Sequence, residues 1–100
     1  MYIAMNRFRI GQGFEDGFEE MWRTRDSKLE GVPGFVEFHL LRGPAIEGGT
    51  LFISHSRWES HAAFTAWTES DAFKQAHAQA RAPEGTYLGH PDFEGFEIVL

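Results

Sequence analysis

The order of patterns along this chain predicts an α+β fold in which strands and helices follow one another as βαββααβ. Residues 2–10 and 93–100 alternate between two faces, which is the period of a strand, and residues 35–41 and 51–58 form a strand hairpin. Between the strands, apolar residues three or four positions apart mark helices. This order favours a four-stranded antiparallel sheet with its helices on one face, the ferredoxin-like or split-βαβ arrangement, as a single domain spanning residues 1–100.

The first strand and the first helix are separated by a break at Gly11 and Gly13. On the strand, one face carries every second residue, namely Tyr2, Ala4, Asn6, Phe8 and Ile10. From Phe14 the apolar period becomes helical and continues to Leu29, and the glycines and proline of residues 31–34 then end the helix. The hairpin that follows has its turn at residues 43–49, which contain three glycines.

Two short helices precede the last strand. Ser60 is a candidate N-cap for the first of them, and Ser70 or Asp71 is a candidate N-cap for the second, which carries apolar and small residues as far as Ala80. Residues 82–91, which contain two prolines and two glycines, are expected to form a loop.

Both faces of the predicted sheet carry apolar residues. In its second strand, Val36, Phe38 and Leu40 are expected on one side, with Phe35 and Leu41 on the other. A monomer would leave one of these faces in water. We therefore expect a two-fold homodimer in which sheet packs against sheet, a dimeric β-barrel.

Composition excludes several classes of function. A net charge of −6 argues against non-specific nucleic-acid binding, which depends on neutralisation of phosphates by Lys and Arg. The absence of cysteine excludes disulfides, thiolate nucleophiles and cysteine-based metal sites. The sequence has no signal-peptide pattern and no stretch of about 20 apolar residues that would cross a membrane. We expect a cytoplasmic protein without a membrane partner.

Three residues far apart in sequence are candidates for one site. Asn6 is an amide on an otherwise apolar strand face, Trp67 lies on the first short helix, and His77 lies among alanines on the second. Together they would suit a flat, metal-centred ligand, because the imidazole can hold the metal and the indole can press on the plane. Each residue also has a structural interpretation. Asn6 would then bond to the backbone, Trp67 would belong to the core, and His77 would be an ordinary surface or core histidine.

Other patterns are weaker. Neither H-x-H nor HExxH spacing occurs among the remaining histidines, which are His39, His55, His61 and His90. The Gly11, Gly13 and Gly17 spacing departs by one residue from a dinucleotide fingerprint, and the hairpin topology lacks the parallel unit that this fingerprint needs. Trp22 and Trp58 fit apolar patterns, and we assign both to packing.

These residues and their setting resemble a known family. The segments YIAMNRF, HSRWES and AFTAWTESDAFKQAHAQAR are similar to those of the antibiotic biosynthesis monooxygenase superfamily, specifically its IsdG-type haem-degrading members. The resemblance covers nearly the whole chain in the same element order. Its most specific part is the pattern W-x-x-S-x-x-F-x-x-H from Trp67 to His77, combined with Asn6 on the first strand.

The resemblance implies a role for each of the three residues. His77 would be the proximal ligand of the haem iron, and Asn6 would lie on the distal side and donate a hydrogen bond to an oxygen species on the iron. Trp67 would press on the porphyrin and force it out of plane. Haem would thus be both cofactor and substrate, and dioxygen and an external electron donor would be required. Because the chain has no flavin or nicotinamide motif, the electrons would come from a reductase partner.

The resemblance implies a haem-degrading monooxygenase that opens the porphyrin and releases iron. Two other functions remain open: a cofactor-independent monooxygenase acting on a polycyclic aromatic such as a polyketide, and a non-catalytic haem-binding protein. The first gives His77 no necessary role, and the second does not need a distorting Trp67. Arg25 and Arg81 are both candidates to meet the haem propionates. The loop at residues 82–91, with Tyr87 and His90, could cover the haem edge.

Overall fold

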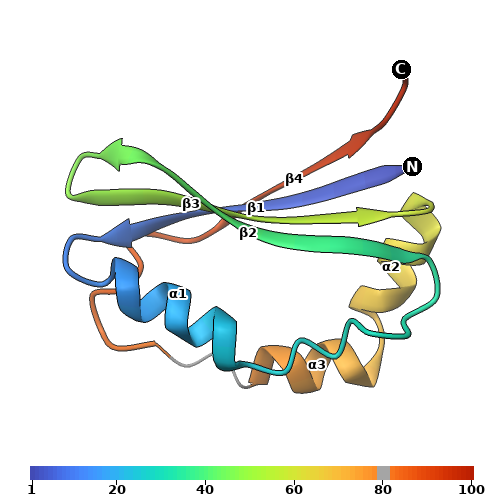
Figure 1. Cartoon of the computed structure of the whole chain (residues 1–100), viewed down its shortest axis with the longest axis horizontal. Coiled ribbons are helices and arrows are strands. Elements are labelled where there is room, and N and C mark those ends of the chain that lie inside the picture. Colours follow the sequence, from blue (N-terminus) through green and yellow to red (C-terminus); the bar gives the residue numbers. More distant parts are fainter. Residues whose placement is uncertain (79–81) are drawn as a thin grey trace.

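The computed structural model describes residues 1–78 and 82–100 and has the predicted element order. The strands are β1 (Tyr2–Gly11), β2 (Phe35–Ile46), β3 (Gly49–Trp58) and β4 (Asp92–Glu97), and the helices are α1 (Glu15–Thr24), α2 (His61–Thr68) and α3 (Asp71–Ala78). The strands form one antiparallel sheet in the order β2-β3-β1-β4, and the helices lie beneath it (Figure 1). The α+β, ferredoxin-like prediction is confirmed. Within one chain the sheet is open, with β2 and β4 at its edges.

The first helix is shorter than predicted. It ends at Thr24, where Arg25 takes an extended backbone conformation and its N–H makes the last bond to the Met21 carbonyl. The Asp26 carboxylate then accepts a hydrogen bond from the N–H of Lys28, at 3.0 Å, and Lys28 itself has a left-handed φ of 62°. Such a local side-chain bond competes with helix formation. Residues 25–30 are therefore not helical, and the prediction that the helix continues to Leu29 is wrong.

The hairpin is longer and its turn tighter than predicted. β2 continues to Ile46 and β3 begins at Gly49, so only Glu47 and Gly48 separate the strands, and Gly48 has a left-handed φ of 79°. A turn with a left-handed residue at its second central position favours glycine there. At the other end of the chain, β4 covers Asp92–Glu97 rather than residues 93–100.

A bulge at the start of β2 changes which residues face the helices. Phe35 is paired with Trp58, but Glu37 is paired with Arg57, so Val36 is the extra residue between the two pairs. Phe35 therefore packs on the helix side against Trp58, with ring centroids 5.5 Å apart. The prediction that Phe35 shares the opposite face with Leu41 is wrong because a bulge shifts the alternation by one residue.

Helix starts follow the predicted capping. The Ser60 side chain accepts the N–H of Ala63 at 3.1 Å, and the Ser70 side chain accepts the N–H of Phe73 at 3.2 Å. Ser70, not Asp71, is thus the cap of α3. The predicted position of Ala80 lies outside the described residues.

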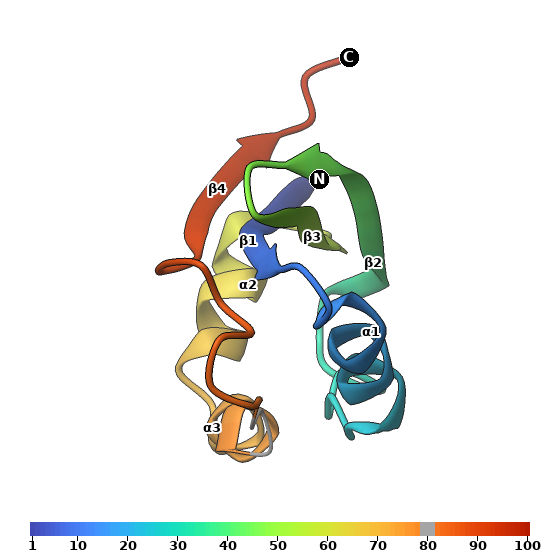
Figure 2. The ribbon, with the colours of Figure 1, turned by 90° about the vertical axis from the view of Figure 1, so that its left-hand side faces the viewer.

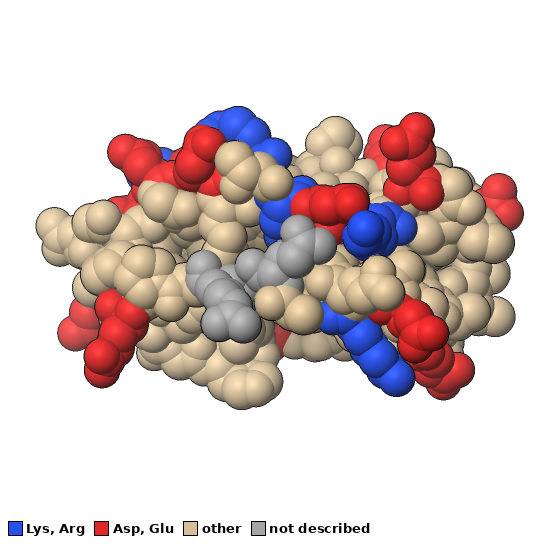
Figure 3. Space-filling view, turned by 90° about the horizontal axis from the view of Figure 1, so that it is seen from below, with Lys and Arg blue, Asp and Glu red and all other residues tan. Residues whose placement is uncertain are grey.

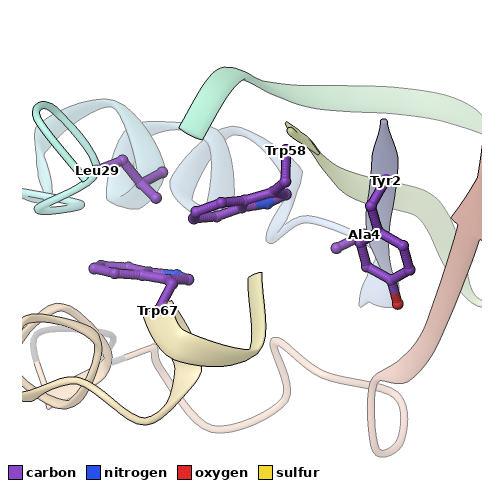
Figure 4. Packing of buried hydrophobic residues seen from close by; sticks show 5 residues of the cluster. All are labelled: Tyr2, Ala4, Leu29, Trp58 and Trp67. Atoms are coloured by element: carbon purple, nitrogen blue, oxygen red, sulfur yellow. The ribbon is translucent and has the colours of Figure 1, made fainter. Parts of the chain in front are cut away.

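Two clusters of buried side chains join the helices to the sheet. The first, beside α2, contains Tyr2, Ala4, Leu29, Trp58 and Trp67 (Figure 4). The second, beside α1, contains Phe8, Ile10, Phe18 and Phe52. On β1 the first cluster ends at Ala4 and the second begins at Phe8, and Asn6 lies on the same face between them. Burial of apolar area is the main stabilising term in folding. A polar side chain between two apolar clusters therefore points to a role other than packing.

The face of the sheet opposite the helices is uncovered in the single chain. Paired residues on it include Ile3 with Phe96 and Leu41 with Ile53, and Leu41 and Phe96 are 42% and 47% exposed. We call this surface the outer sheet face. In the part of the chain that the structure describes, no helix has the length and apolar character needed to cross a membrane.

Candidate functional site

A cavity of about 390 Å³ lies where the two buried clusters meet. All seven elements contribute residues to its wall. In Figure 2, α1 lies under one side of the sheet and α2 and α3 under the other. The volume falls in the range of about 300–1,000 Å³ that is usual for small-molecule and cofactor sites. Asn6, Trp67 and His77 all line this cavity, so the structure brings the three candidate residues together.

His77 is held by a bond within its own helix. Its Nδ1 lies 2.9 Å from the carbonyl oxygen of Phe73, and the centroids of the two rings are 3.9 Å apart. A backbone carbonyl can only accept a hydrogen bond, so Nδ1 is the donor and carries the proton. In the neutral ring the lone pair is then on Nε2. This is the arrangement of a metal-binding histidine, in which a second bond sets the tautomer and the ring orientation.

Trp67 forms part of the cavity wall and part of the core at once. It is only 7% exposed, it stacks on Trp58 with ring centroids 6.3 Å apart, and its ring meets that of Phe73 edge-on at 5.6 Å. Figure 4 shows the Trp58 and Trp67 rings one above the other, with Leu29 beside them. Because neighbours contact it from two sides, the Trp67 ring is held in place. It presents a rigid aromatic surface to the cavity.

One serine connects the two helices that carry Trp67 and His77. The Ser70 hydroxyl donates to the carbonyl of Trp67 at 2.7 Å and accepts the N–H of Phe73 at 3.2 Å. The end of α2 and the start of α3 are therefore bonded to the same side chain. This explains how Trp67 and His77, on different helices, keep a defined relative position.

Asn6 is half-buried on β1, opposite Ser54 of β3 and Phe93 of β4. Among the residues that the structure describes, its side-chain amide makes no hydrogen bond. The predicted structural role, in which this amide bonds to nearby backbone, does not account for the observed contacts. A polar group on the wall of an apolar cavity is instead suited to bind a ligand.

Trp22 and Arg25 also line the cavity, and sequence analysis did not place Trp22 there. Trp22 packs against Phe8, Phe18 and Phe38, as predicted, and its buried Nε1 has no hydrogen-bond partner among the described residues. By contrast, Trp58 is fully buried and its Nε1 donates to the Ser56 hydroxyl at 2.9 Å. The three-residue spacing of Trp22 and Arg25, at the end of α1, could have suggested that these two side chains lie close together.

Burial affects the ionisation of two groups near α1. It lowers the pKa of Arg25, an effect that Tyr87 partly opposes, and it raises the pKa of Tyr87, an effect that Arg25 partly opposes. Tyr87 itself packs on Phe8 and Phe18, at 6.2 and 5.9 Å between ring centroids, and does not line the cavity. Figure 3 shows the helix side of the molecule, where acidic side chains lie mainly toward the two ends and basic ones nearer the middle.

The other candidates lie elsewhere. His90 is exposed, with its Nδ1 at 3.0 Å from the Pro91 carbonyl, and does not line the cavity. Arg81 lies outside the described residues. Within residues 1–78 and 82–100, no group of three or more His, Asp or Glu side chains is arranged to hold a metal ion. Gly13 has a φ of 93° and forms the turn between β1 and α1. The paired strands are antiparallel, so these glycines do not belong to the parallel unit that a dinucleotide fingerprint needs.

Comparison with known proteins agrees with this site and fold. A family model described as antibiotic biosynthesis monooxygenase matches residues 1–79. A haem oxygenase (mycobilin-producing) from Mycobacterium tuberculosis is 32% identical over 93 residues, which cover 92% of this chain and 86% of the relative. A haem oxygenase (staphylobilin-producing) from Staphylococcus haemolyticus is 30% identical over 77 residues, covering 77% of this chain and 73% of the relative.

Solved structures share the fold over the whole chain. The haem degrader MhuD from Mycobacterium tuberculosis, solved with two haems bound in its active site, has a TM-score of 0.77 at 30% identity, covering 100% of this chain and 97% of that one. SnoaB, a cofactor-independent oxygenase from Streptomyces nogalater, has a TM-score of 0.72 at 19% identity, covering 99% and 93%. At that lower identity the second likeness shows the fold alone.

Proposed function

Because the chain belongs to the antibiotic biosynthesis monooxygenase family, and because its cavity joins an oriented imidazole to an indole and an amide, we propose that it is a haem-degrading monooxygenase. It binds haem through His77, oxidatively opens the porphyrin and releases iron. The observation that carries the proposal is the bond from His77 Nδ1 to the Phe73 carbonyl, which leaves Nε2 as a ligand atom at the cavity. The named functions of the relatives support the same activity.

The residues present fit this ligand. Seven of the sixteen described residues that line the cavity are Phe or Trp, and its volume suits a bound small molecule. An imidazole nitrogen is the most common protein ligand of haem iron, and His77 is the histidine on the cavity wall among the described residues. When bound, haem supplies the iron that activates dioxygen and the carbon skeleton that is oxidised.

Asn6 and Trp67 would direct the chemistry without binding the metal. The amide of Asn6, on the sheet side of the cavity, donates a hydrogen bond toward the reacting oxygen. Trp67, fixed between Trp58 and Phe73, would form a rigid wall that presses against the bound porphyrin. Dioxygen and external electrons are co-substrates, and a separate reductase delivers the electrons.

A titration tests the proposal against the two alternatives. Hemin is added to the purified protein and a Soret band is recorded, and then ascorbate or a reductase is added under air. Loss of the Soret band with release of iron is the expected result. A spectrum unchanged by hemin would favour a cofactor-independent monooxygenase that acts on a polycyclic aromatic, and haem that stays intact under reductant would favour a non-catalytic haem-binding protein.

We also propose a homodimer with one haem site in each subunit. The outer sheet face leaves Leu41 and Phe96 in water in a single chain, and burying it against a second copy would remove them and close the two sheets into a barrel. Light scattering at micromolar concentration is expected to give about twice the chain mass of 11.4 kDa. A stable mass near that of one chain would contradict this proposal and leave the haem site unaffected.

Trp67→Phe is expected to keep haem bound while slowing its degradation. The smaller ring preserves an apolar wall beside Trp58 but relaxes the pressure on the porphyrin, so a flatter haem and a slower loss of the Soret band are expected. Resonance Raman or NMR spectra of the bound haem report the flattening directly. Thr65→Ala, at an exposed position on the same helix, serves as the control and should match the wild type. Wild-type haem geometry in Trp67→Phe would show that this indole acts only in packing.

A further inference from the structure

One buried serine differs from the other buried polar residues of the protein. Among the described residues, the buried polar side chains are those of Thr50, Ser54, Ser56 and Thr86. The hydroxyls of Thr50, Ser56 and Thr86 each make a hydrogen bond of 2.7 to 2.9 Å. The Ser54 hydroxyl makes none in the part of the chain that the structure describes. Because buried polar groups in native proteins are nearly always paired, this exception calls for an explanation.

Ser54 lines the cavity beside Asn6. The two residues are directly opposite each other in the register of β1 and β3, and both line the cavity. Directly opposed residues of antiparallel strands point to the same face of the sheet, with Cβ atoms about 4.5–5.5 Å apart. The same row across the sheet carries Leu40 of β2 next to Ser54 and Phe93 of β4 next to Asn6. A hydroxyl and an amide thus form one polar pair between two apolar side chains.

The hydroxyl of Ser54 is open to the cavity. Among the described residues, the unpaired side-chain nitrogens and oxygens that protein atoms close off completely lie elsewhere, and none belongs to Ser54 or Asn6. An unpaired hydroxyl that is not closed off, on a residue that lines the cavity, is within reach of a molecule bound there.

The polar pair and His77 belong to opposite walls. Ser54 and Asn6 lie on the sheet, whereas His77 lies on α3, which runs below the sheet in both views (Figures 1 and 2). A hydroxyl and a primary amide can each donate a hydrogen bond to one acceptor. Donors that are in place before the ligand arrives favour a ligand that carries or develops negative charge. Because apolar side chains flank the pair, its chemistry suits a small acceptor rather than a large polar group.

We propose that Ser54 is a second ligand-binding residue beside Asn6, and that its hydroxyl donates a hydrogen bond to the small molecule that reacts on the sheet side of the cavity. This inference rests on the proposed function, which identifies that molecule as dioxygen. It adds a residue of β3 to a site whose other polar groups come from β1 and α3.

The experiment uses cyanide as the probe, because it is a small anion that binds ferric haem and accepts hydrogen bonds. Its affinity is measured by absorbance titration of the hemin-loaded wild type, Ser54→Ala and the control Ser56→Ala. Ser56 lies on the same face of β3, but its hydroxyl already bonds to the Trp58 Nε1 and the Ala4 carbonyl. Ser54→Ala should bind hemin as the wild type does and lose roughly tenfold in affinity for cyanide, as expected for loss of one hydrogen bond to a charged group. Ser56→Ala should keep the wild-type affinity for cyanide.

Thermal unfolding of the hemin-free proteins separates this role from a structural one. Ser54→Ala removes an unpaired hydroxyl, so its melting temperature should equal or exceed that of the wild type. Ser56→Ala leaves the buried Trp58 N–H without its partner and should melt at a lower temperature. An unchanged cyanide affinity in Ser54→Ala, or a drop in its melting temperature as large as that of Ser56→Ala, would overturn the role of Ser54 while leaving the proposed function standing. A wild type that takes up no hemin would overturn the proposed function, and the role of Ser54 with it.

Discussion

His77→Ala is expected to abolish tight haem binding. The variant removes the imidazole whose Nδ1 bond to the Phe73 carbonyl leaves Nε2 as the metal-binding atom. Removal of an outer-shell partner of a metal ligand typically costs about 10–100-fold in affinity, so loss of the ligand itself should cost more. Absorbance titration with hemin should show a weakened and shifted Soret band, and degradation under reductant should fall with the loss of binding.

A second histidine provides the matched control for this variant. His90 also has its Nδ1 near a backbone carbonyl, 3.0 Å from the oxygen of Pro91, and like His77 it is exposed, but it does not line the cavity. His90→Ala is therefore expected to bind haem as the wild type does. If His77→Ala kept the Soret band and the activity while His90→Ala lost them, the axial ligand would be in the loop at residues 82–91 instead.

Asn6→Ala is expected to retain haem and to degrade it about 10–100-fold more slowly. The amide lies on the sheet face of the cavity and makes no hydrogen bond among the described residues, so its removal breaks no observed contact. What it removes is a donor to the reacting oxygen, which is worth about 1–3 kcal/mol in a dry site, and about 1.4 kcal/mol corresponds to a factor of ten in rate. Single-turnover loss of the Soret band under air measures this directly.

Stability and binding show whether the effect of Asn6→Ala is chemical. Because alanine leaves the strand pairing with Ser54 and Phe93 in place, we expect an unchanged or slightly higher melting temperature and nearly unchanged hemin affinity. A wild-type degradation rate with haem fully bound would assign Asn6 to packing. A loss of affinity as large as the loss of rate would show that Asn6 helps to hold the ligand, rather than to direct the reaction.

Local features of the sequence were enough to predict the order of helices and strands and many of the residues of the candidate site. The alternation of residues 2–10 placed Asn6 on the same face as Ala4 and Phe8, as the structure shows, because the period of a strand is set by its backbone. Ser60 was recognisable as a cap because the bond it makes reaches only to Ala63. The family of the chain also followed from the sequence, since the pattern around Trp67 is specific.

Two departures from these local patterns were not predicted. The helical stripe from Phe14 continues in the sequence to Leu29, yet the helix ends at Thr24, and Leu29 reaches the core beside Trp58 by an irregular path. The bulge at Val36 likewise turns Phe35 toward the helices. In the first place the local bond from the Lys28 N–H to the Asp26 carboxylate competes with the helix, and in the second the bulge shifts the alternation so that Phe35 packs against Trp58.

The sequence by itself determined the element order, the family and the residue types that can hold a flat, metal-centred ligand, because these depend on local backbone preferences and short spacings. Tertiary structure alone decided that Asn6 and His77, which are 71 positions apart, line one cavity. It also left the buried Nε1 of Trp22 without a partner among the described residues, while the Nε1 of Trp58 donates to the Ser56 hydroxyl. Two identical residue types therefore differ in hydrogen bonding because the fold decides which groups lie within reach.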